Sequence, residues 1–394
     1  MLTPARAFTE DPNYVKQVIS CPKCDWFGLL EEKIKCCPFC GNKDKRITRA
    51  MMRPWGFAPR NAESIPDVQL SEEYTAVQQP LYSTLPEAEE MKLAPGCKNI
   101  RIASRTNQRI IMLNKGSDGK GFIVCKDCGA AMPGDDISVL NDINRPYRTK
   151  SFLSKCRHSN YFNVNLGYDF ITDMLVLEFK IDNMIIDTRR NDNPWLNRAA
   201  QSLAEALRLV ASKKLDVEFT ELVTGYRLRT GSEASYVDIY LYDSLSSGAG
   251  YAVSVADSIV ELLTDIRELL NSCDCASACS KCLKHYRNQY LHGMLDRFAA
   301  LQLLEWGVDG KNALPIKFES QVKMIMPLVN ILKQSGCEIT CDCEIIAMKR
   351  RNKKKIVVYP AMWADPNASD TIFVSDAYIK YAKPYAVQKI LDNI

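Results

Sequence analysis

Four cysteines lie within ten residues in the stretch CDCASACSKC, at positions 273–282. Such a set can close disulfides, bind a metal ion or carry out redox chemistry. Zinc binds four thiolates in a tetrahedron at Zn–S distances of about 2.3 Å, and a four-cysteine iron–sulfur cluster uses the same donors. The spacing C-x-C-x3-C-x2-C therefore predicts zinc, with an iron–sulfur cluster as the alternative, at Cys273, Cys275, Cys279 and Cys282.

Two CxxC pairs near the N-terminus form a second donor set, CPKC and CPFC, separated by twelve residues. Each pair can turn tightly enough to point both thiolates at one ion, which is the arrangement of a zinc ribbon. Four cysteines leave no open coordination position, so this zinc would be structural. Its predicted ligands are Cys21, Cys24, Cys37 and Cys40.

A third donor set combines CKDC with KCRH farther along the chain. Three thiolates and one imidazole also suit structural zinc, although a lone histidine is as often an ordinary polar residue. The predicted ligands are Cys125, Cys128, Cys156 and His158. Together the three sets predict two to three zinc ions per chain.

Cysteine usage and the N-terminal sequence point to a reducing compartment. The segment MLTPARAFTEDPNYVKQ has no apolar signal core, and no apolar run reaches the roughly 18 residues that a membrane span needs. We therefore expect a cytoplasmic protein without a membrane segment, in which the sixteen cysteines favour metal over disulfides. A net charge of +4 over 394 residues does not by itself indicate nucleic acid.

The order of expected elements predicts a multidomain α+β protein. Zinc-ribbon modules would accompany a mixed sheet with packed helices, a four-cysteine metal loop and a small C-terminal α/β unit. We expect strands near 100–104, 109–114, 121–124, 172–180, 215–222, 225–230 and 235–243, and helices over 194–215, 252–271 and 295–306. In the last eighty residues we expect a helix at 318–336, strands at 338–346, 355–360 and 370–375, and two short helices. The predicted divisions are 1–50, 51–160, 161–312 and 313–394.

Two further features could contact a ligand. The run KRRNKKK at 349–355 is either a solvated hairpin tip or a contact to a phosphate backbone through Lys349, Arg350, Arg351, Lys353, Lys354 and Lys355. Asp243 ends a predicted strand just before a glycine-containing turn with Gly248 and Gly250. This acid could cap the following turn or have a functional role.

Six segments, in this order, resemble one known family: RPWGF (53–57), LNKGSDGKGFIVCKDCG (113–129), LGYDFITDMLVLEF (166–179), WLNRAAQSLAEAL (195–207), YDSLSSGAGY (242–251) and CDCASACSKCLKHYRNQYLHGMLDR (273–297). The resemblance is to the MrfA-type zinc-binding region of certain bacterial DNA helicases. The same region occurs in DrmB, the helicase-partner subunit of the DISARM phage-defence system.

The resemblance implies work on DNA beside a superfamily-two helicase, directed against invading DNA in the defence setting. It also implies that Cys273, Cys275, Cys279 and Cys282 bind the family's metal. Two departures stand out: family members often have glycine where this chain has Ser247, and this sequence has no Walker A motif for a nucleotide. The last eighty residues match nothing in the family.

The leading hypothesis is a non-catalytic zinc-binding accessory subunit, with no catalytic residues, that binds DNA and a superfamily-two helicase in trans within a hetero-complex. One alternative is a metal-dependent nuclease or hydrolase that uses Asp169, Asp173, Glu178 and Asp243. Another is a scaffold without DNA contact. His285, three residues after Cys282, could orient the metal loop or replace a cysteine.

Overall fold

The computed structural model describes residues 15–21, 26–30, 35–37, 41–43, 47–53, 81–82, 91–116, 119–138, 155–188, 194–229 and 234–394. These residues form two compact units. The first is Met1–Glu90, Arg105–Met174 and Tyr242–Val253, and the second is Met91–Ser104, Leu175–Leu241 and Ser254–Ile394. Sheets, several helices and cysteine clusters confirm the predicted fold class. The division into the four predicted domains remains a prediction.

The first unit is built from short strands around part of one long strand. Its own strands are β1 (Val15–Ser20), β2 (Phe27–Leu29), β3 (Ile47–Met52), β4 (Leu81–Tyr82), β7 (Phe122–Cys125) and β8 (Ala131–Pro133). It shares β6 (Ile100–Asn114), β9 (Tyr161–Asp182), β11 (Ala234–Asp243) and α2 (Tyr251–Asp257) with the second unit. β1 pairs antiparallel with β2 and β3, β3 pairs parallel with β9, and β7 pairs antiparallel with β8 and β9. Buried Met52, Phe122, Val124, Val164 and Leu166 form a core cluster there.

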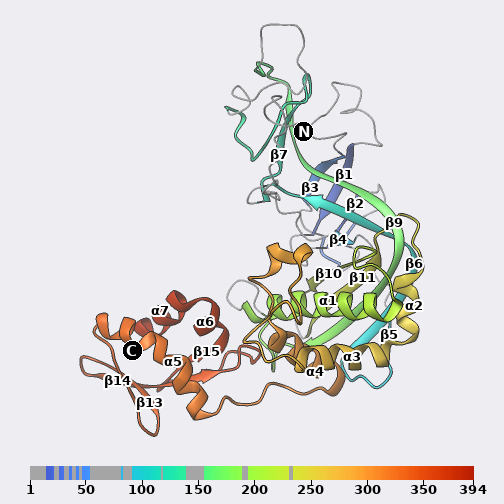
Figure 1. Cartoon of the computed structure of the whole chain (residues 1–394). Helices are drawn as coiled ribbons and strands as arrows, with labels where there is room; N and C mark the ends of the chain where they lie inside the picture. Colours follow the sequence, from blue (N-terminus) through green and yellow to red (C-terminus); the bar gives the residue numbers. More distant parts are fainter. Residues whose placement is uncertain are drawn as a thin grey trace. The chain divides into compact units, whose positions relative to one another are not determined.

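The second unit packs helices on a sheet that contains β10 (Leu222–Arg229), β11 and the end of β9, with β5 (Lys92–Leu93) paired to β6. Its helices include α1 (Pro194–Leu215), α3 (Ile259–Asn271), the 3₁₀ helix η4 (Tyr286–Leu291) and α4 (Arg297–Asp309). α1 packs against α3, α4 and β10 (Figure 1). Gly307 allows α4 to lie close to the sheet, because a Cβ there would be 2.5 Å from the Phe179 ring.

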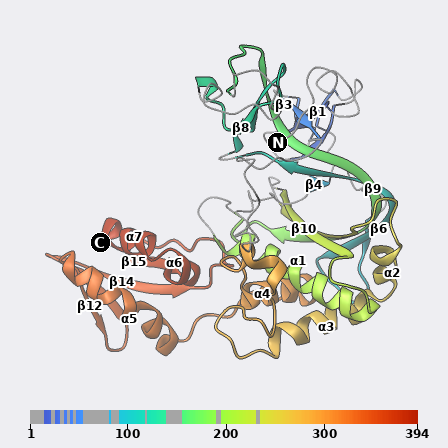
Figure 2. The same cartoon turned by 45° about the horizontal axis from the view of Figure 1, so that its top comes forward.

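The chain ends in a four-stranded sheet with its own core. Figure 2 shows this part, which contains α5 (Phe318–Gln334), β12 (Glu338–Cys341), β13 (Ile345–Lys349), β14 (Asn352–Tyr359), β15 (Thr371–Ser375), α6 (Asp376–Tyr381) and α7 (Lys383–Asn393). The strand order is β12-β13-β14-β15, and only β14 and β15 run parallel. Among the residues with a described structure, no helix combines the length and apolar character of a membrane span.

Several element predictions are confirmed, and some are wrong. The helix over 194–215 has the predicted bounds, because Pro194 suits a first helical turn. The expected strand at 215–222 is wrong: Asp216 has φ +53 and the chain turns back, so that the Phe219 ring packs under the Arg208 guanidinium at 3.7 Å. The expected helix over 252–271 is two helices that break at Ser258, and strands 100–104 and 109–114 are the single strand β6.

A buried network of charged side chains holds the sheet of the second unit. Arg229 makes two bonds to the Asp238 carboxylate, at 2.6 and 2.8 Å, and a further ion pair to Glu178. Arg227 reaches Asp238 at 3.0 Å, and Arg101 reaches Glu178 at 2.5 Å. Burial alone would raise the pKa of Asp238, but Arg229 and Arg227 outweigh it and lower that pKa. Asp238 is therefore charged, with both oxygens bonded to arginines.

Asp238→Asn is expected to lower the free energy of unfolding by about 3 kcal/mol, because it leaves buried guanidinium groups without their counter-ion. Chemical denaturation measures this change. Because folding lowers the pKa of Asp238, its stabilisation is present above the unfolded pKa of about 4 and is lost as the pH falls below it. The same substitution at exposed Asp342 is the control and should change stability by less than about 0.5 kcal/mol. Equal effects at both positions would contradict the role of Asp238 as the counter-ion of the buried arginines.

Candidate metal centres and the turn at Asp243

The four cysteines of CDCASACSKC come together in one loop between α3 and η4. Their sulfur atoms all lie within 4.8 Å of one another, close enough to hold a metal ion. Individual Sγ–Sγ distances are 3.4 Å for Cys273–Cys279, 3.7 Å for Cys275–Cys282 and 3.9 Å for Cys279–Cys282. A tetrahedron with Zn–S bonds of about 2.3 Å has edges of about 3.8 Å. The loop therefore fits one tetrahedral ion.

The same spacing bears on the iron–sulfur alternative. In a four-iron cluster each cysteine binds a different iron from outside the cluster, so its thiolates stand farther apart than the ligands of one ion. Sulfur atoms as close as those between Cys273 and Cys282 favour a single ion over a cluster.

Backbone N–H groups support the loop in the way that a metal knuckle requires. The amide of Cys279 donates to the Cys282 sulfur at 3.2 Å, and the amide of Lys281 donates to the Cys279 sulfur at 3.4 Å. The Lys281 amide, followed by Cys273, lowers the pKa of the Cys279 thiol to about 7. Burial raises the pKa of the Cys282 thiol to about 12, so an incoming ion would displace a proton from it.

Residues that the sequence analysis did not single out bond this loop to neighbouring helices of the second unit. Arg297, at the start of α4, donates to the Cys275 carbonyl at 3.1 Å and to the Leu270 carbonyl at 2.8 Å. Asp296 caps α4 and accepts bonds from Lys380 at 3.0 Å and from the Tyr381 hydroxyl, both on α6. Lys380 also donates to the Ala276 carbonyl. For Asp296 and Arg297, the only signal in the sequence was the LDR at the end of the last resembling segment.

The donor set predicted from CKDC and KCRH is also brought together, beside the end of β7. Cys128 and Cys156 have sulfur atoms 3.6 Å apart, and the Nδ1 atom of His158 lies 3.5 Å from the Cys125 sulfur and 3.7 Å from the Cys156 sulfur. Burial is the main cause that raises the pKa of the Cys128 thiol to about 12. All four donors lie within 4.8 Å of one another, so His158 occupies the position of a fourth ligand.

The N-terminal donor set predicted from CPKC and CPFC is only partly described. Cys24 and Cys40 lie outside the described residues. Cys21 and Cys37 are buried, and their amides donate 2.8 Å backbone bonds to the carbonyls of Trp26 and Asn42 respectively. The Asn42 side chain lies 3.9 Å from the Cys21 sulfur. The four-cysteine ribbon remains a prediction.

Asp243 caps the turn that follows its strand. The fully buried carboxylate accepts N–H bonds from Ala249 at 2.6 Å, Tyr251 at 3.1 Å and Ala252 at 2.8 Å, and so satisfies the amides at the start of α2. Gly250 donates to Asp173 at 3.2 Å. Gly248 has φ +74, and a Cβ there would be 2.3 Å from the Asp173 carboxylate. The contacts of Asp243, Gly248 and Gly250 are thus those of a structural turn.

The other acids considered for a nuclease, and His285, have partners that stabilise the fold. Asp169 pairs with Lys16 at 2.6 Å, and Glu178 belongs to the buried arginine network. His285 accepts from the Arg287 amide and lies 3.2 Å from buried Glu205, so it caps η4 and does not replace a cysteine. Within the described ranges, three or more donor atoms come close enough for an ion only in the two cysteine sets. The acids proposed for a nuclease do not form such a group there.

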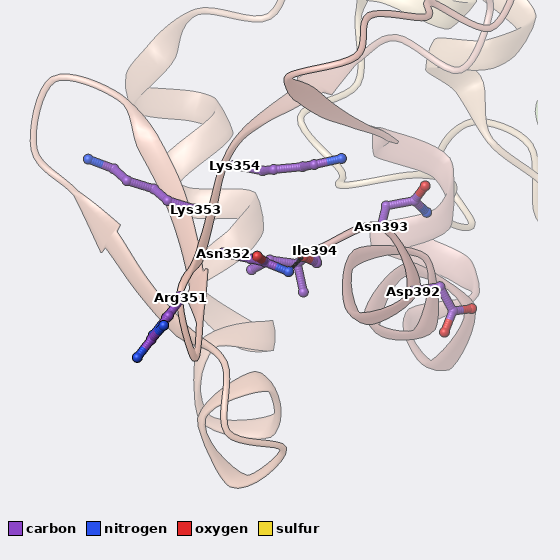
Figure 3. A pocket seen from close by; sticks show the side chains of 7 residues that line it. All are labelled: Arg351, Asn352, Lys353, Lys354, Asp392, Asn393 and Ile394. Carbon is purple, nitrogen blue, oxygen red and sulfur yellow. Dashed lines mark hydrogen bonds between the residues drawn. The ribbon is translucent and has the colours of Figure 1, made fainter.

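The basic run forms the hairpin between β13 and β14. An open cavity of about 540 Å³ lies at its tip (Figure 3), where Lys353 and Lys354 extend in opposite directions from β14. Lys355 is paired with Glu344 at 2.5 Å. The six cations therefore do not share one face, because alternate strand residues point to opposite sides. The cavity is lined by Arg351, Asn352, Lys353, Lys354, Asp392, Asn393 and Ile394.

We expect purified protein to be colourless, and Cys282→Ser to lower its zinc content by about one ion per chain, because four donors hold one ion. Elemental analysis measures the content. Cys343→Ser, at an exposed cysteine outside both sets, is the matched control and should leave it unchanged. A brown protein with absorbance near 400 nm would instead identify an iron–sulfur cluster.

Ser247 has φ +81, a backbone conformation in which glycine is favoured. Ser247→Gly is expected to raise the free energy of unfolding by about 1 kcal/mol, because it removes left-handed strain from a residue with a Cβ. Gly248→Ala should lower it by about 2 kcal/mol or more, because the new Cβ meets Asp173.

Chemical denaturation of both variants measures these changes. Gly293→Ala is the control, because it shows what replacing a glycine by alanine does at a position without left-handed backbone or a close neighbour. A Cβ added at Gly293 would meet no atom within 4 Å, and this residue has no positive φ, so its substitution should change little. A Ser247→Gly protein less stable than wild type would show that the serine side chain stabilises the turn.

Two comparisons by sequence relate this chain to known proteins: one to a domain family and one to a much longer protein. Residues 203–283 match the family model of the MrfA Zn-binding domain, which covers the end of α1 through the four-cysteine loop. The chain is 30% identical over 383 residues to Druantia protein DruE of Escherichia coli (strain UMEA 4076-1). This alignment covers 92% of the chain but 21% of DruE, so the chain spans about a fifth of that relative.

Two solved structures are more distant. The DUF1998 helicase MrfA bound to DNA gives a TM-score of 0.35 at 12% identity, over 58% of this chain and 24% of MrfA. MrfA bound to DNA and AMPPNP gives 0.27 at 10% identity, over 53% and 23%. The chain thus contains a segment similar to the MrfA Zn-binding domain, and that segment includes the four clustered cysteines.

Proposed function

We propose that this chain is a zinc-stabilised, non-catalytic module of a bacterial defence assembly that contacts DNA beside a helicase. The observation that carries the proposal is the 30% identity to DruE, which extends over 92% of the chain. The MrfA Zn-binding segment supports the link to a helicase. The chain spans only about a fifth of DruE, so a role in the same kind of defence is proposed for this chain and does not follow from the identity alone.

The defence setting that we propose is related to Druantia. A DrmB-like role in DISARM rests on the resembling sequence segments alone. The cytoplasm, where thiols stay reduced, is the compartment that suits cysteine metal sites. Zinc is the proposed ion, in two sites at the described cysteine sets and in a third if the N-terminal ribbon forms.

The proposed partner is a superfamily-two helicase on a separate chain (in trans), which forms a hetero-complex with this one and supplies the ATPase. The 394 residues contain no Walker A motif to hold a nucleotide. The carboxylates considered for a nuclease are bonded to arginine, lysine or backbone N–H groups. These partners favour a binding role over hydrolysis.

DNA contact is proposed at the β13–β14 hairpin. Arg350 and Arg351 lie in its turn, and Lys353 and Lys354 follow on opposite sides of β14. None of these four side chains makes an ion pair with an acid in the described part of the chain. Cations on both sides of a tip can contact phosphates on either side of it, without reading bases.

Lys353→Gln combined with Lys354→Gln is expected to weaken DNA binding and to lower the slope of log Kd against log salt by about 1.8, because two phosphate contacts are lost. Fluorescence anisotropy over a salt series measures both quantities. Lys323→Gln with Lys333→Gln, two exposed lysines on α5, gives the same charge change away from the hairpin and should leave the slope unchanged.

A wild-type affinity that does not depend on salt would remove the phosphate contacts from the proposal. Equal affinity in both double variants would leave a scaffold without hairpin contact as the better account. The helicase partnership fails if tagged chain purified from its native host brings no ATPase with it. Cleavage of DNA by the isolated chain with magnesium would favour the nuclease.

A further inference from the structure

Two tyrosines on η4, directly after the four-cysteine loop, stand in solvent. Tyr286 is 80% exposed and Tyr290 is 66% exposed. Tyrosine is usually at least partly buried, because its ring carries a large apolar area. Both residues lie beyond the segment that matches the MrfA Zn-binding domain, so that likeness assigns them nothing.

The turn that presents these tyrosines is rigid. Asn288 is 1% exposed, and its side chain donates to Glu205 at 2.9 Å and to the Leu283 carbonyl at 2.9 Å. Its oxygen accepts from the His285 amide at 2.9 Å, which completes a capping box at the start of η4. A fixed turn loses little conformational entropy when a ligand binds to it. The rings are thus held in solvent by a network that is buried beneath them.

The exposed charged side chains in the segment that carries the tyrosines are basic, whereas buried Glu205 lies beneath the turn, 2.9 Å from the Asn288 side chain. Residues 275–295 contain no Asp or Glu, but they contain Lys281, Lys284 and Arg287. No acid pairs with these three cations among the residues whose structure is described. Lys281 and Lys284 flank Cys282 and would also offset the negative charge of four thiolates on zinc. Arg287, which follows Tyr286, does not adjoin a ligand.

We propose that Tyr286 and Tyr290 form a stacking platform for unpaired bases of single-stranded DNA, with Arg287 and the two lysines on its phosphates. This inference rests on the proposed function and names the DNA form and the site. Exposed aromatic rings beside cations are the common means of binding a single strand without sequence preference. Duplex DNA keeps its bases stacked on one another, so it gains nothing from the rings.

The test measures binding of fluorescent oligothymidylate of about 15 nucleotides, and of a duplex of equal length, by anisotropy at one fixed salt concentration. Tyr286→Ala with Tyr290→Ala should weaken single-strand binding about tenfold or more, because stacking contributes about 1–3 kcal/mol per base. Tyr286→Phe with Tyr290→Phe keeps both rings and should stay within about twofold. Duplex affinity should not change in either variant.

Zinc content and circular dichroism show whether each variant keeps its fold. If wild-type chain binds neither oligonucleotide, the DNA contact of the proposed function fails. If it binds oligothymidylate and the alanine variant binds equally well, only the platform fails. A matching loss in the phenylalanine variant, or on the duplex, would overturn stacking. Loss of a co-purifying protein with unchanged DNA binding would make this face a protein contact instead.

Discussion

Four sulfur atoms that must all reach one ion set the course of the chain after α3. Cys273, Cys275, Cys279 and Cys282 lie within 4.8 Å of one another, and this constraint determines where the loop's carbonyl groups point. Arg297 donates to the carbonyl of Cys275 in the loop and to that of Leu270 near the end of α3. These bonds place the start of α4, which packs on α1. Lys380 bonds a third carbonyl and brings α6 to the same loop. A metal loop of ten residues thus determines contacts among several helices.

Several buried charged groups in this chain stabilise its fold. Asp238 and Glu178 neutralise buried arginines, Asp243 caps α2, and Asp296 caps α4 while it accepts bonds from α6. A carboxylate already bonded to N–H groups or guanidinium groups has little capacity left for a magnesium ion or a water nucleophile. Cations that make no ion pair in the described regions include those at the hairpin tip and the three from Lys281 to Arg287. The buried acids thus serve the fold, and the exposed cations are the groups that the proposed binding role would use.

The sequence was informative where the physical cause is local. Cysteine spacing located both described donor sets, and Pro194 with an apolar stripe predicted α1 to the residue. The strand expected at 215–222 was wrong because alternation of apolar residues cannot show that Phe219 packs back on Arg208. Asp296, Arg297 and Asn288 were missed because their partners are far away in sequence, such as Tyr381 and Glu205. His158 was undecided until the fold brought its ring to Cys125.

The two described donor sets differ in how far apart their ligands lie along the chain. Cys275 and Cys282 are seven positions apart, whereas Cys128 and Cys156 are 28 apart. Two doublings of loop length add about 1.2 kcal/mol to the entropy of closure. The short loop therefore closes around an ion at a smaller entropic cost, whereas the pairing of β7 with β9 helps to bring the two halves of the longer site together. On this ground alone, scarce zinc would bind at 273–282 before it binds at the other site.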